Sequence, residues 1–318
     1  MCASSGDDLS RTRGGNGNLI WSELQNFAVG EQDDRVDDTE DLQMNILVDA
    51  HVNVYGCYSL PEFLNSAVKN FSAAATELTI NHTPARVLLL TESSNEDYFA
   101  KFVLWAKNER AQDEWRFELT DEPESIVALN RNGDKLYLLA GRQIRTGEDL
   151  EVLVACTHQR IADNKNIADT VAEAADSNSV VILPWGFGKW MGHRARIIDE
   201  LIENLQHQPV HLGDNSGRVP LVGEPPQFRR IRKQGKFVLR GTDPLPFAGQ
   251  EKRIGRFGFL VHGDFDPSRP AFSIRQLLHQ LEVRPIPYGR LERIMPFVRH
   301  QVLLQCRKRG WIGAGVPS

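Results

Sequence analysis

The central part of the chain alternates short, almost wholly apolar runs with amphipathic segments. Runs that are apolar at nearly every position are typical of strands buried on both faces, as in a parallel sheet. Between these runs, apolar residues recur at the spacing of one helix face. The strands are expected at residues 46–51, 86–92, 150–157, 180–186, 209–215 and 236–243, and the helices at about 60–71, 95–103, 164–176 and 193–206.

A different pattern occupies the segment from Trp115 to Gly141. Apolar and polar residues alternate there, and the turn sequence "NRNGDK" separates two of the runs. This pattern predicts a β-meander inserted around residues 113–145. The series of βα units around it is compatible with a barrel or with an open, doubly wound sheet.

Polar residues at the predicted strand ends distinguish these two folds. Catalytic groups of a (β/α) barrel lie at the ends of several strands around one mouth, whereas an open sheet concentrates them at one switch point. In this chain the polar side chains are spread over most of the strands: Asp49, His51, Asn53, Glu92, Glu151, Asp214 and Asp243. The sequence therefore predicts a TIM-like (β/α) barrel, formed by residues 43–318 as a single α/β domain.

Composition limits the classes of function. With 318 residues, of which 41% are hydrophobic and 25% charged, the chain can form a core without disulfides. The net charge of −5 argues against general nucleic-acid binding, and no run approaches the roughly 18 apolar residues of a membrane helix. The first residues have no apolar stretch of the secretory kind, so a cytoplasmic protein is expected. Residues 1–42 lack periodicity and are predicted to be a flexible acidic tail. The oligomeric state cannot be inferred.

Asp49 and His51 are the most specific candidates for chemistry. Side chains two residues apart on a strand point to the same side, so a carboxylate and an imidazole would face the barrel mouth together. Such a pair can hold a divalent ion and activate a bound water. Asn53, two residues further, offers an amide oxygen, a poor ligand for zinc but acceptable to magnesium or manganese.

The loop "PWGFGKWMGHR" follows the predicted strand at 180–186. Gly186 and Gly188 let the backbone approach an anion, and Lys189 and Arg194 add positive charge beside Trp185. The segment "GDNSGR" adds Asp214, Asn215 and Arg218 to the same rim. Together these residues predict a pocket for a small, polar, anionic ligand.

The segment "VDAHVNVYGCYSLPEFL" resembles the first strand and helix of PHP-type phosphoesterases and, more distantly, of the amidohydrolase superfamily. "GTD" after "KFVL" is similar to a late-strand motif of the PHP family, and "PWGFGKW" to a run in uncharacterised bacterial PHP-like proteins. The resemblance implies that Asp49 and His51 are metal ligands, that Glu92 or Glu151 completes the site, and that Asp243 closes it. Asn53 stands where the family has histidine, and Pro244 follows Asp243 where a further histidine is expected, which leaves one or two ions, or none.

Three hypotheses follow. The first is a hydrolase of a phosphoester or amide that uses Mn, Zn, Fe or Mg, with Asp49, Asp214 and Lys189 taking part in catalysis. The second is a non-catalytic ligand-binding protein on the same barrel. The third is a glycosidase that uses carboxylates such as Glu92 and Glu151 without metal.

Overall fold

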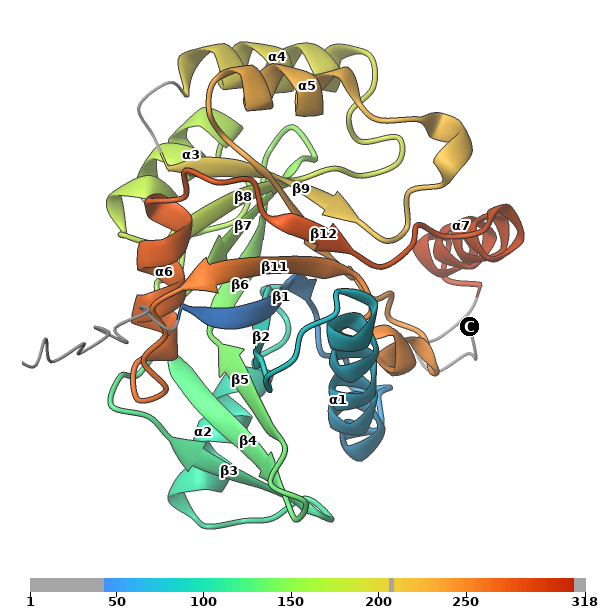
Figure 1. Cartoon of the computed structure of the whole chain (residues 1–318). Helices are drawn as coiled ribbons and strands as arrows, with labels where there is room; N and C mark the ends of the chain where they lie inside the picture. The colour runs from blue at the N-terminus through green and yellow to red at the C-terminus, as the bar shows by residue number, and fades with distance from the viewer. Residues whose placement is uncertain (1–42, 206–208, 312–318) are drawn as a thin grey trace, which may run out of the picture. The chain divides into compact units, whose positions relative to one another are not determined.

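Two mixed β-sheets form the framework of the computed structural model, which describes residues 43–205 and 209–311 (Figure 1). The larger sheet has seven strands, in the order β12 (Ile286–Tyr288), β11 (Gly258–Gly263), β1 (Met44–Val52), β2 (Ala85–Leu90), β5 (Lys135–Leu139), β4 (Ser125–Asn130) and β3 (Trp115–Leu119). The smaller has five, in the order β10 (Val238–Gly241), β9 (Val210–Asn215), β8 (Val180–Pro184), β7 (Glu151–Ala155) and β6 (Gly141–Arg145).

The predicted TIM-like barrel is wrong, because the described strands do not close into one parallel ring. β1 pairs in parallel with β2 but antiparallel with β11, and β7 runs antiparallel to both of its neighbours, β6 and β8. A TIM-like barrel requires every strand to be parallel to the next. Apolar strands are buried on both faces in a layered fold as well as in a barrel, so the apolar runs could not reveal the difference.

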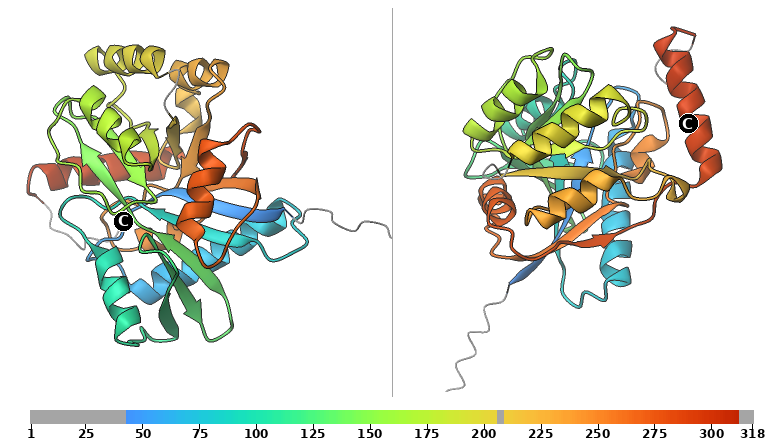
Figure 2. Two further views of the ribbon diagram at one scale, coloured as in Figure 1. Left: turned by 90° about the vertical axis from the view of Figure 1, so that its left-hand side faces the viewer. Right: turned by 90° about the horizontal axis from the view of Figure 1, so that it is seen from above.

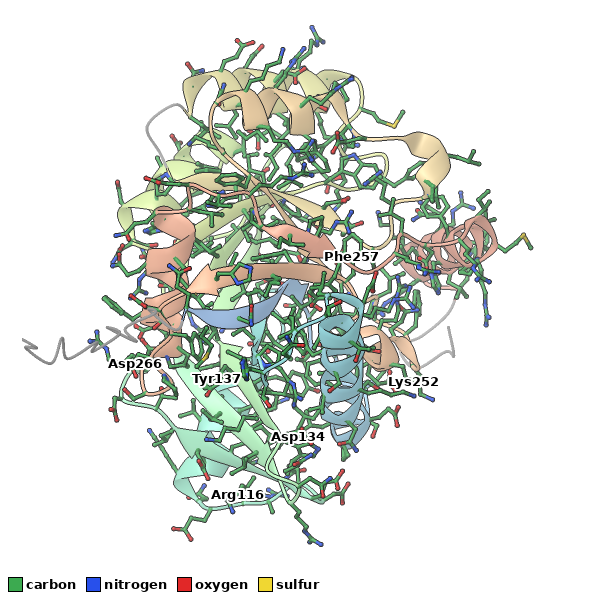
Figure 3. The ribbon with its side chains drawn as sticks, viewed as in Figure 1. Arg116, Asp134, Tyr137, Lys252, Phe257 and Asp266 are labelled. Carbon is green, nitrogen blue, oxygen red and sulfur yellow. The ribbon has the colours of Figure 1, made fainter. Side chains whose placement is uncertain are left out.

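Helices and sheets are stacked in four layers, seen from three sides in Figures 1 and 2. Helices α1 (Leu60–Glu77) and α2 (Tyr98–Lys107) cover one face of the larger sheet through a core that includes Phe63 and Phe102. The other face packs against the smaller sheet and α6 (Pro270–His279), with Tyr137 (labelled in Figure 3) among the residues between them. The outer face of the smaller sheet is covered by α3 (Ile167–Asp176), α4 (His193–Asn204) and α5 (Pro226–Lys233).

Two glycines let the sheets approach each other closely. A Cβ on Gly241, at the end of β10, would lie 2.3 Å from the His51 backbone nitrogen on β1. A Cβ on Gly141, at the start of β6, would lie 2.4 Å from the Leu90 carbonyl oxygen on β2. Only glycine allows backbones this close. The first contact brings the ends of β1 and β10 together, and the second brings the end of β2 to the start of β6.

The six predicted strands and four predicted helices are present at the expected places. The predicted meander is also present as β3, β4 and β5, but β5 pairs with β2, so the meander extends the larger sheet. The C-terminal part adds β11, β12, the short turns η1 (Pro220–Val222) and η2 (Gln250–Arg253), and α7 (Ile294–Lys308). The predicted acidic tail lies outside the described residues. No helix in the described ranges is long and apolar enough to cross a membrane.

Candidate functional site

A cavity of about 300 Å³ lies where several strands end, and we call it the strand-end cavity. β1, β8, β9 and β10 each contribute a residue at or just beyond their carboxyl ends, and β7 contributes its first residue. Parallel strands present these ends at one edge of a sheet, which explains why residues far apart in the chain meet there. Seven of the predicted site residues line the cavity: Asn53, Glu151, Trp185, Gly186, Lys189, Asn215 and Asp243.

Glu151 reaches the cavity because β7 is reversed. In the antiparallel pair β7–β8, Leu153 lies opposite Ile182, so the first residue of β7 lies at the end of β8. There the Glu151 carboxylate forms an ion pair with the Lys189 ammonium. Gly186 makes this geometry possible, since a Cβ at that position would lie 2.8 Å from Cδ of Lys189. The lysine charge predicted for an anionic ligand is thus matched by a carboxylate of the protein.

His51 and Asp243 form the centre of a hydrogen-bonded group at the cavity, whose lining includes Asp243. His51 Nε2 lies 3.0 Å from Gln143 Oε1 and 3.4 Å from Asp243 Oδ1. Asn215 Nδ2 donates to the other Asp243 oxygen at 3.0 Å and to the Trp185 carbonyl oxygen at 2.8 Å. Asp243 has a left-handed backbone, with φ 49°, which aspartate tolerates better than most residues. Strained backbone of this kind is common at binding sites.

Helix α7 closes one side of the cavity, a feature that the sequence reasoning missed. Its Phe297 ring packs edge-on against Phe187 with the centroids 5.0 Å apart. Gln301 and Lys308 of the same helix also line the cavity. Phe297 and His300 are buried and three residues apart, a helical spacing that could have signalled a packed face.

Behind this helix a buried network forms a wall of the cavity. The Arg253 guanidinium forms an ion pair with Glu292, with Nη1 3.1 Å from Oε1. His300 Nδ1 lies 3.2 Å from Glu292 Oε2, and His300 Nε2 lies 3.0 Å from the side-chain amide of Gln250. Arg253 also donates to Ser216 Oγ at 2.8 Å. These contacts connect η2 and α7 with the segment that follows β9 through buried polar groups.

Asp49, the leading candidate for metal binding and catalysis, is fully buried and lies outside the cavity lining. Its oxygens accept hydrogen bonds from the backbone nitrogens of Thr242 at 2.7 Å, Gly255 at 2.9 Å and His51 at 3.3 Å. The Thr242 hydroxyl donates to the same carboxylate. Burial raises the pKa of Asp49 to about 6, and the hydrogen bonds oppose this shift. Asp49 therefore holds β1 to the segments after β10 and η2.

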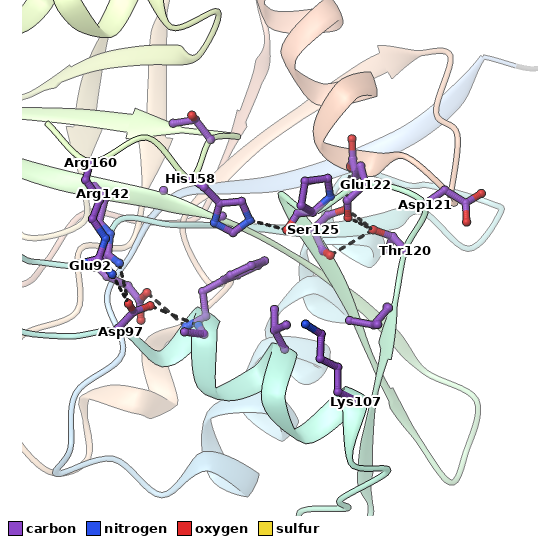
Figure 4. A pocket seen from close by; sticks show the side chains of 18 residues that line it. Glu92, Asp97, Lys107, Thr120, Asp121, Glu122, Ser125, Arg142, His158 and Arg160 are labelled. Carbon is purple, nitrogen blue, oxygen red and sulfur yellow. Dashed lines mark hydrogen bonds and ion pairs between the residues drawn. The ribbon is translucent and has the colours of Figure 1, made fainter.

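Glu92 lies in a different cavity, of about 660 Å³, shown in Figure 4. Its two oxygens accept from the backbone nitrogens of Tyr98 at 2.6 Å and Phe99 at 3.3 Å, which caps α2. Burial raises the pKa of Glu92. In the same cavity Asp97 pairs with Arg142 at 3.0 Å and with Arg160 at 2.8 Å. These charged groups have partners within the protein.

Three further predicted residues form structural ion pairs outside the lining of the strand-end cavity. Asp214 and Arg218 are both buried and make a two-pronged pair, with Nε–Oδ1 at 2.8 Å and Nη2–Oδ2 at 2.9 Å. Arg194 bridges Asp149 Oδ2 at 3.0 Å and the Gly188 carbonyl oxygen at 2.8 Å. The pairing with Asp149 relieves the unfavourable position of a cation in the first turn of α4.

The predicted metal ligands do not fit a divalent ion in this arrangement. The Asp49 and Glu92 oxygens are engaged by backbone donors, and Glu151 is paired with Lys189. Among residues 43–205 and 209–311, no group of three or more His, Cys, Asp or Glu side chains could hold an ion. The prediction of a metal-binding hydrolase is therefore not supported by the donor set.

Comparisons with known proteins add little. No protein-family model matches the chain, and no curated protein matches it. Among solved structures, PsfC from Pseudomonas syringae PB-5123 aligns over 85% of this chain and 100% of its own, with 12% sequence identity and a TM-score of 0.46. A likeness of that size carries no argument about function. The resemblance to the PHP family remains a prediction from short motifs.

Proposed function

We propose that the protein binds a small, uncharged, hydroxyl-rich ligand, of the size of a monosaccharide or polyol, in the strand-end cavity. The observation that carries this proposal is the convergence of amide, carboxylate and aromatic side chains from six strands and α7 on one cavity. Small-molecule sites combine an apolar wall with a few well-placed polar groups in this way.

The charge balance of the lining favours a neutral ligand over the anionic one that the loop sequence predicts. Lys189 is paired with Glu151, and Arg253 with Glu292. Asp243 remains 28% exposed at the side chain, and Lys308 is the further cation of the lining. A carboxylate in the cavity lining accepts hydrogen bonds from hydroxyl groups but repels an anion.

The hydrogen-bonding groups and aromatic rings suit a ligand with many hydroxyls and one apolar face. Amide side chains, which both donate and accept, come from β1, β6, β9 and α7: Asn53, Gln143, Asn215, Gln301 and Gln305. Trp185, Phe187 and Phe297 supply apolar ring surfaces beside them. Burial raises the pKa of Tyr55, so its phenol stays protonated and can donate. A volume of about 300 Å³ is at the lower end of ligand sites.

A glycosidase would need two carboxylates facing one substrate. Glu92 and Glu151 line different cavities, and Glu151 is held by Lys189. The Glu92–Glu151 pair that this hypothesis names is therefore not assembled, and we propose binding without catalysis.

The proposal is tested by calorimetric titration with a panel of monosaccharides, polyols and sugar acids. We expect at least one neutral member to bind with 1:1 stoichiometry, and Asp243→Asn to raise its Kd about tenfold because one acceptor becomes a donor. Asparagine also tolerates the left-handed backbone of this position. Gln301→Ala should weaken binding, whereas Gln159→Ala, an exposed control outside the lining, should not. Saturable binding of sugar acids alone, or equal effects of the two glutamine variants, would contradict the proposal.

A further inference from the structure

A second cavity, of about 920 Å³, opens on the other side of the Arg253–Glu292–His300 network, and we call it the basic cleft. It is formed by the end of α1, by η2, by the turn after β12 and by the start of α7. Lys252, on the η2 turn beside α1, is labelled in Figure 3. The six cations that line it are Lys252, Arg253, Arg256, Arg290, Arg293 and Arg299.

Positive charge in the cleft is only partly balanced by carboxylates. Without Arg299, the lining still has five cations against two carboxylates, Glu77 and Glu292, an excess of three positive charges in a chain whose net charge is −5. Glu292 is already shared between Arg253 and His300. Within the described ranges, no carboxylate forms an ion pair with Lys252, Arg256, Arg290 or Arg293.

The fold itself forces these like charges together. Gly289 has φ +79°, and a Cβ there would lie 2.1 Å from the Arg256 carbonyl oxygen. The turn after β12 therefore lies directly on the segment before β11. Arg290 is the residue next to Gly289, so it follows directly on the contact with the Arg256 backbone. The pKa of Arg256 is lowered, first by desolvation and then by the charge of Arg253. Repulsion of this kind is unfavourable in the free protein, and a bound anion would relieve it.

We propose that the basic cleft binds a small organic molecule that carries two adjacent phosphate groups. Guanidinium groups match phosphate oxygens in a two-pronged geometry, and cations from three separate segments can surround more than one phosphate. Leu291, Met295 and Pro296 give the cleft an apolar side for the organic part. A concave cleft suits a small molecule better than a flat membrane surface. This site shares the Arg253–Glu292–His300 wall with the strand-end cavity, but the proposal does not depend on the function proposed for that cavity.

The test uses inorganic pyrophosphate as the probe, titrated into the full-length protein by calorimetry at constant ionic strength. We expect 1:1 binding, with a Kd about tenfold or more below that for orthophosphate, because two phosphate groups engage more guanidinium groups than one. Arg290→Gln/Arg293→Gln should raise the pyrophosphate Kd about tenfold or more. The control variant Arg131→Gln/Arg229→Gln removes two exposed arginines that do not line the cleft. It should change the pyrophosphate Kd by less than about twofold.

Two outcomes of the titration would overturn the proposal, and a third comes from a vesicle control. One is the absence of saturable pyrophosphate binding at matched ionic strength. The other is an equal loss in both double variants, which would reveal a general charge effect. A lipid headgroup is distinguished by vesicles that contain anionic phospholipid. If the protein binds such vesicles and pyrophosphate does not displace it, the site recognises a surface and the proposal fails.

Discussion

Asp49 places a carboxylate in a part of the core where no water reaches it, held by three backbone amides and one hydroxyl. The same Asp-x-His pattern that predicts a metal ligand thus fulfils a structural role. A carboxylate that accepts several hydrogen bonds and one that binds an ion have the same sequence signature. What separates them is the position of Thr242 and Gly255, which lie about 200 residues away in the chain and could not be read from the strand.

The raised pKa of Asp49 predicts a pH-dependent stability that can be isolated with Asp49→Asn. The folded pKa is about 6 against 3.8 for the ordinary group, so the folded protein holds this proton while the unfolded chain has lost it. The stability that this bound proton contributes is fully present below pH about 3.8 and is lost as pH rises through about 6. We expect the unfolding free energy of wild type, relative to Asp49→Asn, to fall by about 2 kcal/mol between pH 4 and pH 7. Urea denaturation at several pH values measures it, and a difference that does not vary with pH would refute the assignment.

The buried Asp214–Arg218 pair gives a second prediction at this scale. Arg218→Met leaves the Asp214 carboxylate buried without its two-pronged partner, at 4% exposure of the side chain. We expect a loss of about 3–5 kcal/mol in unfolding free energy. The double variant Asp214→Leu/Arg218→Met removes both charges, so its unfolding free energy should fall clearly less than that of the single variant. If the single and double variants were equally destabilised, the pair would contribute only through packing.

At the scale of elements, the contact between β1 and β10 depends on a glycine. Gly241→Ala should destabilise the protein by at least about 3 kcal/mol, because the added Cβ would collide with the His51 backbone and neither strand can move freely. Gly56→Ala serves as the control, since the nearest atom to its Cβ would be the Tyr98 hydroxyl at 3.5 Å. Thermal unfolding measured by circular dichroism compares the two. A Gly241→Ala protein as stable as the control would mean that the sheets can separate at this point.

The elements themselves were largely predictable, and their pairing was not. Apolar runs and helical periodicity located β1, β2, β7, β8, β9 and β10, because these patterns depend only on neighbouring residues. The antiparallel pairing of β1 with β11, which rules out the barrel, depends on a segment more than 200 residues further along. The convergence of Asn53, Asn215 and Asp243 was predictable from strand ends, since that argument needs only a common edge. Glu151, at the start of β7, joins them because β7 is reversed, which an apolar run does not reveal. The contribution of α7 was not, because nothing in the strand pattern places a C-terminal helix over that edge.

At the scale of the whole described unit, the two sheets share one of the three apolar cores. Residues from β1, β2, β7, β8 and β11 meet in it, so neither sheet has a complete core without the other. We therefore expect a single cooperative unfolding transition. Hydrogen exchange should give the same opening free energy for Leu88 in β2 and Ile182 in β8. Separate free energies for the two strands would indicate that the sheets unfold independently.

Arg253, Glu292 and His300 line both the strand-end cavity and the basic cleft, so each ligand would contact the same three side chains from opposite sides. An anion that draws Arg253 away from Glu292 changes the charge that the other cavity presents, and the reverse holds equally. Thermodynamic linkage then requires symmetry: the factor by which pyrophosphate changes the affinity for the neutral ligand equals the factor by which that ligand changes the affinity for pyrophosphate. Because the two sites share the Arg253–Glu292 ion pair, the affinity measured at one site would report whether the other site is occupied.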